Sequence, residues 1–214
     1  MPESHKTLMR DETFAALVAA GIVACQWWIM TDLRIPAKWY VVVAGAILVI
    51  ALVFVQLVRA QQKRALRLVR FGLALLLIVA NCLNLVALTA QALFAAPSGA
   101  TELLFTGIVL WTMNVLVFGL VYWVIDGGGP EARGGAGPIT RDWVFPQETD
   151  DRNASPWRPM FGDYLYLGFT GAIAFGPTDA MPYSRRAKAA MALEGLLALA
   201  ILGVIIARGV SLAG

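Results

Sequence analysis

The sequence predicts an all-α membrane protein with five transmembrane helices and one re-entrant helix near the C-terminus. The 214 residues are 59% hydrophobic and 14% charged, with a mean hydropathy of +0.69, a composition far from that of soluble domains. Apolar stretches long enough to cross a bilayer alternate with short polar segments. One further apolar run, residues 163–175, is too short to cross, and two prolines follow it.

The N-terminal part predicts a three-helix membrane domain, residues 13–94, after a polar tail, residues 1–12. The expected spans are residues 13–30, 39–58 and 71–94. A short loop with Pro36 joins the first two spans, and a basic segment, residues 59–70, joins the second to the third. This basic segment is either a solvated connector or a helix attracted to anionic lipid headgroups.

The third span is unusual because it carries Asn81 and Asn84, which share one helix face. Polar side chains within a span usually hydrogen-bond to neighbouring helices. The first interpretation is therefore helix packing, and the alternative is an ion or solute pathway.

The C-terminal part, residues 95–214, predicts a pore-like domain. Its expected elements are a spanning helix 103–125, a connector 126–161, a short helix 163–175, an irregular loop 176–182 and a spanning helix 189–208. Non-helical backbone at membrane depth is tolerated only where protein buries it or where it lines a wet cavity. The order of short helix, irregular loop and full-length helix is therefore typical of a re-entrant pore loop.

This stretch resembles the pore domain of bacterial potassium channels and other pore-loop channels. The family pattern of pore helix, T-V-G-Y-G-D-x-x-P and inner helix aligns without gaps, and the filter positions here read Ala174-Phe175-Gly176-Pro177-Thr178-Asp179, followed by Pro182. The run from Leu193-Glu194 to Arg208 also resembles family inner helices. The resemblance implies that residues 103–125 form the outer helix and that the chain is a homotetramer around an ion path.

The filter departs from that family at two positions. Pro177 stands at the tyrosine position and Thr178 at the second glycine position, whereas Gly176 is kept. Proline fixes φ and threonine resists positive φ, so a ring of backbone carbonyls of the potassium type is not expected. The predicted function is weakly selective or non-potassium-selective ion conduction, and the alternative is a non-conducting membrane scaffold or partner-binding subunit that retains the channel fold.

Charges around the filter-like loop leave the sign of a permeating ion open. A ring of Asp179 carboxylates would attract cations, whereas Arg185, Arg186 and Lys188 at the mouth would attract anions. The resemblance also implies that Asp179 can hold the loop from behind. Pro177 and Phe175 could form an apolar constriction. Acidic residues of the connector form either a vestibule or a solvated rim: Asp142, Glu148, Asp150 and Asp151.

The last helix contains Glu194, a carboxylate inside a span, which is costly and marks a functional candidate. It either faces the cavity or a partner near the filter, or it snorkels or packs against another helix. Gly195 and Gly203, with Ala198 at the position of the hinge glycine of relatives, give a small-residue face suited to close helix contact.

Enzyme chemistry is not expected, because the sequence has no nucleophile–base pair, metal-ligand cluster or phosphate loop. His5 is the only histidine, and Cys25 and Cys82 lie within predicted spans as apolar thiols. We therefore expect no catalytic residue, cofactor or metal. The net charge of +3 reflects basic residues at membrane edges and does not indicate nucleic-acid binding. The expected partners are the lipid bilayer, an inorganic ion and further copies of the chain.

Orientation signals conflict. With five spans, fourteen lysines and arginines lie on the side of the N-terminus and the filter-like loop, and three lie on the other. The positive-inside rule then places the loop at the cytoplasmic face, whereas the resemblance implies the opposite. Either way, the prediction is a multi-pass protein of a bacterial plasma membrane.

Overall fold

The computed structural model describes residues 3–32, 43, 45–47, 49–50, 63–94, 100–133, 140–148, 157–174 and 180–213. Within these residues, four stretches are long and apolar enough to cross a membrane: Arg10–Ile29, Leu66–Phe94, Thr101–Gly128 and Arg185–Val210. They lie in the long helices α1 (Glu3–Asp32), α3 (Lys63–Phe94), α4 (Ala100–Ile125) and α7 (Arg185–Ala213). The chain is an all-α integral membrane protein.

The predicted second span, residues 39–58, lies largely outside the described residues. The described ones within it, residues 43, 45–47 and 49–50, are helical. A Cβ atom at Gly45 would lie 3.1 Å from Val23 of α1 and 3.7 Å from Leu76 of α3. Gly45 therefore packs between these two helices.

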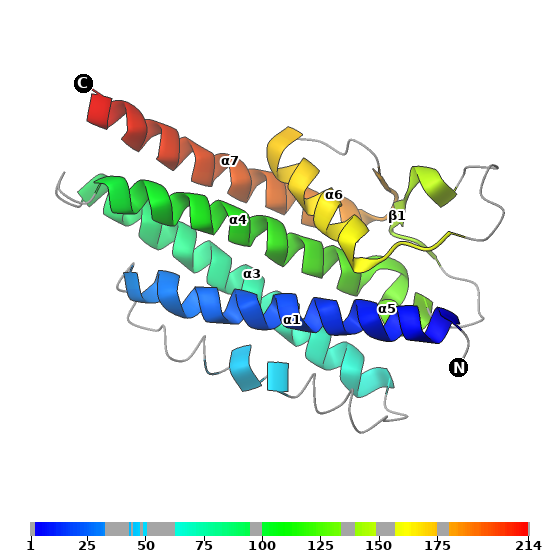
Figure 1. The fold of residues 1–214 in the computed structure, drawn as a ribbon. Helices are drawn as coiled ribbons and strands as arrows, with labels where there is room; N and C mark the ends of the chain where they lie inside the picture. Colours follow the sequence, from blue (N-terminus) through cyan, green and yellow to red (C-terminus); the bar gives the residue numbers. More distant parts are fainter. Residues whose placement is uncertain are drawn as a thin grey trace.

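Helix α4 is the centre of the bundle. It packs against α7, α3 and α1, and against the short helix α6 (Phe161–Ala174). Of its spanning stretch 67% is buried, compared with 17% in α7. Figure 1 shows the N-terminus, α5 (Pro130–Arg133), β1 (Trp143–Val144) and the first turn of α7 at one end of the bundle, and the C-terminus at the other. We call these the β end and the C-terminal end.

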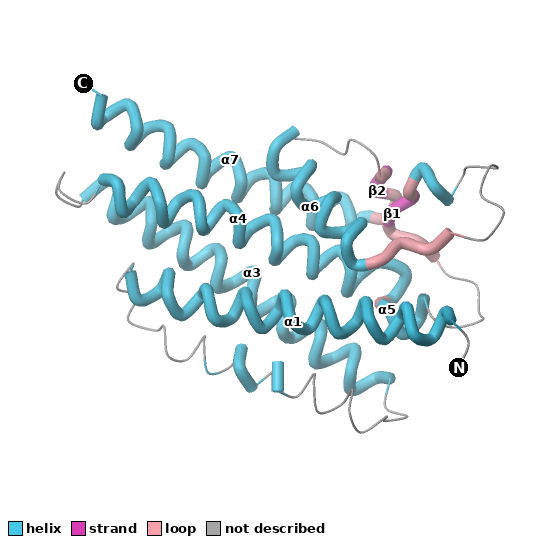
Figure 2. The backbone as a smooth tube through the Cα atoms, in the orientation of Figure 1, coloured by secondary structure: helices cyan, strands magenta, loops and turns pink. Residues whose placement is uncertain are grey.

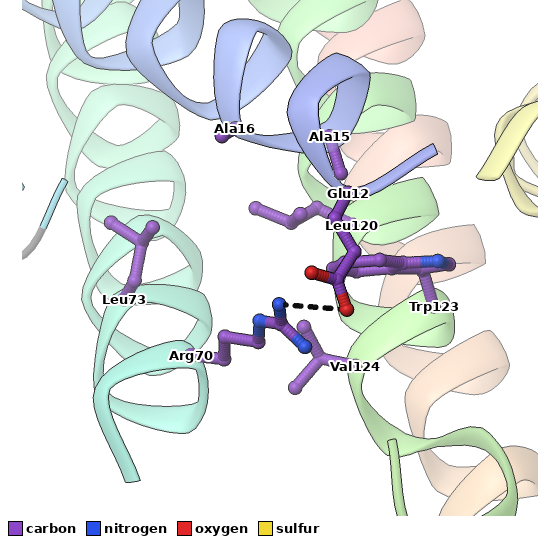
Figure 3. Close-up of a pocket in the computed structure, with 8 residues that line it drawn as sticks. All are labelled: Glu12, Ala15, Ala16, Arg70, Leu73, Leu120, Trp123 and Val124. Carbon is purple, nitrogen blue, oxygen red and sulfur yellow. Dashed lines mark ion pairs between the residues drawn. The ribbon is translucent and has the colours of Figure 1, made fainter. Parts of the chain in front are cut away.

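Two long helices begin earlier than the apolar pattern predicts. Residues 3–12, expected as a polar tail, belong to α1, and α3 begins inside the basic segment. An ion pair of 3.4 Å between Glu12 and Arg70 joins these polar turns. Figure 3 shows the pair beside Trp123, whose ring centroid lies 4.9 Å from the Arg70 guanidinium carbon. Tertiary contacts therefore stabilise helical turns that hydropathy places outside the membrane.

A turn rich in glycine follows α4. Gly127, Gly128 and Gly129 have φ angles of 59°, 83° and 98°, a backbone region that other residues adopt only with strain. The first two of these glycines belong to a 3₁₀ helix, η2 (Asp126–Gly128), and α5 follows the turn. A second 3₁₀ helix, η3 (Pro146–Glu148), comes directly after β1.

Helix α6 enters the bundle from the β end and does not cross it. At about 1.5 Å per residue, its 14 residues extend about 21 Å, less than the hydrocarbon core of about 30 Å. Beyond it, β2 (Met181–Pro182) pairs antiparallel with β1 at the β end, with Trp143 opposite Pro182 (Figure 2). The chain therefore returns to the end from which α6 starts.

The start of α6 is capped by a reciprocal pair of hydrogen bonds. The backbone N–H of Met160 donates to Asp163 Oδ2 at 2.7 Å, and the N–H of Asp163 donates to the Met160 carbonyl at 3.0 Å. This arrangement resembles a capping box. Helix α6 begins two residues before the predicted short helix, and α7 begins four residues before the predicted last helix.

Candidate functional site

Glu194 of α7 lies buried beneath the short helix. Its side chain is 0% exposed. The Tyr122 hydroxyl of α4 donates a hydrogen bond to Glu194 Oε2. The other oxygen, Oε1, has no hydrogen-bond partner among the residues that the structure describes. The carboxyl group therefore has one oxygen available for a proton or a cation.

Two glycines of α6 give this carboxyl group its place. A Cβ atom at Gly171 would lie 2.6 Å from Glu194 Oε2, and one at Gly168 would lie 3.3 Å from Oε1 and 2.9 Å from the Val115 carbonyl oxygen. Only glycine allows such an approach without displacing neighbours. The backbone of α6 is thus fitted against both α4 and the Glu194 side chain.

Buried amides extend from this carboxyl group into the bundle. Asn114 Nδ2 donates to the Glu194 backbone carbonyl at 3.4 Å and accepts, through Oδ1, a bond of 2.7 Å from Asn81. Asn84 Nδ2 donates to Gln26 Oε1 at 2.5 Å. These four amide side chains are almost completely buried. The bonds join α3 to α4 and α1, as the packing interpretation of Asn81 and Asn84 predicts.

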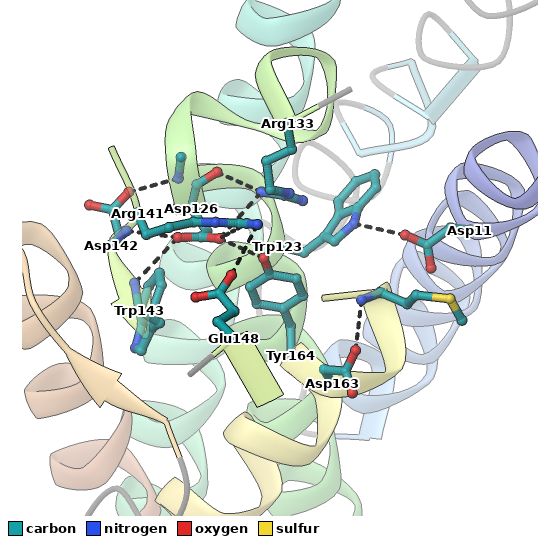
Figure 4. Close-up of polar contacts among 12 residues, drawn as sticks. Asp11, Trp123, Asp126, Arg133, Arg141, Asp142, Trp143, Glu148, Asp163 and Tyr164 are labelled. Atoms are coloured by element: carbon teal, nitrogen blue, oxygen red, sulfur yellow. Dashed lines mark hydrogen bonds and ion pairs between the residues drawn. The ribbon is translucent and has the colours of Figure 1, made fainter. Parts of the chain in front are cut away.

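A second polar cluster lies at the β end and is centred on Asp126 (Figure 4). Its Oδ2 accepts hydrogen bonds from Tyr164 at 2.6 Å and Arg141 at 3.1 Å. Its Oδ1 accepts bonds from the backbone N–H groups of Asp142 at 2.8 Å and Trp143 at 3.3 Å. Arg133 lies 3.9 Å away from Oδ2 and donates to the Asp126 carbonyl at 2.5 Å. Both carboxylate oxygens of Asp126 therefore accept hydrogen bonds.

Asp142 ties this cluster to the start of α7. Arg186 donates to its two carboxylate oxygens at 2.6 and 2.5 Å, and the N–H of Gly127 donates at 3.0 Å. Burial alone would raise the pKa of Asp142, but these hydrogen bonds, with one from Ser184, outweigh it and lower the pKa. The fork-shaped pairing of Arg186 with a carboxylate is the strong form of this contact.

Glu148 belongs to the same cluster. Arg141 forms an ion pair of 3.0 Å with it, and burial raises the pKa of Glu148. Asp142 is 2% exposed. These two acids therefore do not form a solvated rim, whereas Asp150 and Asp151 lie outside the described residues.

The structure describes only some of the predicted filter and mouth residues. Ala174 is the last residue of α6 and Pro182 belongs to β2, whereas residues 175–179, which include Gly176, Pro177, Thr178 and Asp179, lie outside the described residues. Arg185 and Lys188 are exposed. Because Asp142 engages Arg186, the mouth does not present three equivalent cations.

The residues of the predicted small-residue face of α7 lie in two different environments. Ala198 is buried in a small cluster with Val115 and Ala172. Gly195 and Gly203 have no atom within 4 Å of an added Cβ position. Among the residues that the structure describes, the two glycines make no close helix contact.

Sequence reasoning missed several residues of both clusters. Tyr122 lies without distinction in the predicted helix 103–125, and Asp126 is only the first residue of the predicted connector 126–161. The spacing of Gly168 and Gly171, three apart in an apolar helix, is a small-residue signal that could have predicted a close contact. Nothing in the sequence links Tyr122 to Glu194, which is 72 residues away.

No family model, curated protein or solved structure matches this chain significantly. Among the described residues, no group of three or more histidine, cysteine or acidic side chains could hold a metal ion. The candidate site itself contains a buried carboxyl group with one hydroxyl donor, set in a bundle with hydrogen-bonded amides.

Proposed function

We propose that this protein is a pore-loop ion channel of a bacterial plasma membrane, assembled from several copies and lacking a potassium-type filter. The single observation that supports this proposal is the course of α6. A helix of 14 residues enters beside α4 and α7, and the chain returns to the same end at β2. Irregular backbone between such a helix and the next span requires protein burial or a wet cavity.

The exposure of α7 favours an assembly. Only 17% of its spanning stretch is buried, and apolar side chains such as Leu196 and Leu199 are exposed. An exposed apolar surface of this kind can face either lipid or neighbouring copies of the chain. In the proposed pore, α7 is the inner helix and the segment after α6 faces the axis.

Glu194 provides the ionisable side chain next to α6 and the segment that follows it. Its carboxyl group touches α6 where Gly168 and Gly171 allow close approach. A change of charge or length at Glu194 would shift α6, and with it the residues that follow. We assign Glu194 a positioning role, with Tyr122 as its hydrogen-bond donor.

The alternative function is a non-conducting membrane scaffold that keeps this architecture. Pro177 and Thr178 at filter positions favour it, because they disfavour the backbone conformation of a carbonyl-lined filter. The two functions differ in whether an assembled oligomer passes ions.

The test is electrical recording from purified protein in a planar bilayer under a potassium chloride gradient, with the oligomer mass measured in parallel. We expect a current whose reversal potential gives the sign of the preferred ion. Glu194→Gln should alter conductance or open time, whereas Glu102→Gln, at an exposed site in the first turn of α4, should not. Silence from a confirmed oligomer would contradict conduction and support the scaffold.

Asp179→Asn separates the two roles of that residue. A changed ion preference is expected if the carboxylate faces the path, and a changed oligomer yield if it holds the loop from behind. Unchanged current and yield would remove Asp179 from the proposal.

A further inference from the structure

The C-terminal end of the bundle contains a cavity of about 210 Å³ between α3 and α7. Its described walls are three residues of each helix: Thr89, Ala92 and Leu93 of α3, and Val204, Ala207 and Arg208 of α7. Apart from the ends of Thr89 and Arg208, these side chains are apolar. The ends of α3 and α7 that carry these residues lie at the end of the bundle opposite α5 and β1 (Figure 1).

Arg208 is the charged group of this cavity. Its Nε atom is buried and has no hydrogen-bond partner among the described residues. Thr89 is the polar residue of the α3 wall, and its hydroxyl donates to the Leu85 carbonyl at 2.8 Å. A buried guanidinium donor without an acceptor is costly, so the cavity is suited to an anion.

A simpler account of Arg208 is its position near the C-terminal end of α7, where a cation interacts favourably with the helix dipole. That account explains an arginine in this turn. It does not explain why one donor is buried beside an open cavity without an acceptor among the described residues.

The surroundings of the cavity indicate an amphiphile. Arg208 lies two residues before the end of the spanning stretch Arg185–Val210, at the depth of lipid headgroups. Exposed apolar side chains continue from the cavity along both helices, including Val86 and Leu93 of α3 and Ile206 of α7. An anionic head beside Arg208 would leave acyl chains against these surfaces.

We propose that this cavity binds the phosphate of an anionic phospholipid, with Arg208 donating to it and the acyl chains lying along α3 and α7. Basic pockets between transmembrane helices recognise headgroups in this way. The proposal does not depend on ion conduction, because the site lies at the end of the bundle opposite β1 and β2.

The experiment is native mass spectrometry of the full-length protein from nanodiscs made with equal amounts of phosphatidylglycerol and phosphatidylcholine. Wild-type protein is expected to retain phosphatidylglycerol preferentially. Arg208→Ala should reduce that retention about fivefold, the effect of one basic residue near the membrane surface. Arg208→Lys should keep part of it. Arg10→Ala, which removes an exposed arginine at the start of the first span, is the matched control and should retain as much as wild type.

A second variant tests the cavity without changing charge. Ala92→Phe places a ring in the cavity and should also lower phosphatidylglycerol retention, while helical circular dichroism reports that both variants fold. Equal retention in Arg208→Ala and wild type would overturn the proposal. Retention of phosphatidylcholine, or of fatty acid alone, in place of phosphatidylglycerol would also overturn it.

Discussion

Two regions along α4 hold buried carboxyl groups in opposite ways. At the β end, Asp126 accepts hydrogen bonds from two side chains and two backbone N–H groups. About a third of the way along α7, Glu194 has the Tyr122 hydroxyl on one oxygen and no described partner on the other. Both carboxyl groups are 0% exposed.

The difference separates a structural carboxylate from a functional candidate. A fully paired buried charge holds its neighbours in place, whereas a partly paired one inside a membrane costs free energy that the fold does not recover. Places where a chain keeps such a group are expected to be functional. Asp126, together with Asp142, therefore connects α4, α6 and α7 at the β end, whereas Glu194 is the candidate for a role in positioning the short helix.

The largest expected effect is that of Asp126→Ala. Removing this carboxylate takes one ion-pair partner from Arg141 and from the buried Arg133. It also leaves the Tyr164 hydroxyl and the N–H groups of Asp142 and Trp143 without this acceptor, and breaking a buried pair typically costs about 3–5 kcal/mol. Denaturant unfolding in detergent micelles should show a loss of this size. Glu102→Gln, an exposed change in the first turn of α4, should stay within about 0.5 kcal/mol of wild type. Equal stability of Asp126→Ala and wild type would remove the structural role of Asp126.

The next effect concerns the contact between α6 and Glu194. Gly171→Ala would place a Cβ atom 2.6 Å from Glu194 Oε2, and overpacking of this kind typically costs about 1–3 kcal/mol. Its control is Gly162→Ala, on the same helix, where no atom of the described residues lies within 4 Å of the added Cβ position. We expect the thermal unfolding temperature to fall only for Gly171→Ala. A control variant as unstable as Gly171→Ala would mean that helix α6 itself, and not its contact with Glu194, is sensitive.

A pair of tyrosine variants compares the two carboxyl groups directly. Tyr122→Phe removes the described donor to the Glu194 carboxyl group, and leaving a buried polar group unpaired costs about 1–3 kcal/mol. Tyr164→Phe removes one of several donors to Asp126, which typically costs about 0.5–1.5 kcal/mol. The free energy of unfolding should therefore be lower for Tyr122→Phe than for Tyr164→Phe. The reverse order would contradict the difference between the two carboxyl groups.

The smallest effect is a dependence of stability on pH. Arg186 and its companion donors lower the pKa of Asp142 below its ordinary value of 3.8. Because the folded pKa is the lower one, the stability from this group is present above pH 3.8 and is lost as pH falls through the folded pKa. The unfolding temperature of wild type should drop in this range. Arg186→Gln should show a shallower drop, and an identical slope would argue against the ion pair.

The helices were predictable and their polar connections were not. Apolar runs of sufficient length predicted α3, α4 and α7, and a run too short to cross, followed by prolines, predicted α6. Hydropathy could not predict the polar first turns of α1 and α3, because the Glu12–Arg70 ion pair stabilises them across the bundle.

Only one residue of the candidate site could be predicted from the sequence. Glu194 is conspicuous as an acid inside an apolar stretch, so the sequence alone indicated it. Its partners come from α4 and α6, and their approach depends on helix packing that no local pattern describes. Asp126 was hidden for the same reason, since its donors are spread from Arg133 to Tyr164.

The most direct test of the account is the membrane side of the two ends of the short helix. In a background with Cys25 and Cys82 replaced, single cysteines at Gly162 and Tyr183, both exposed, would be labelled with a membrane-impermeant maleimide in oriented vesicles. Val210→Cys, near the end of α7, serves as the marker of the other side. The account predicts that Gly162→Cys and Tyr183→Cys react from one side and Val210→Cys from the opposite side. Labelling of Gly162→Cys and Tyr183→Cys from opposite sides would mean that residues 162–183 cross the membrane, which would contradict a re-entrant helix and the pore proposed from it.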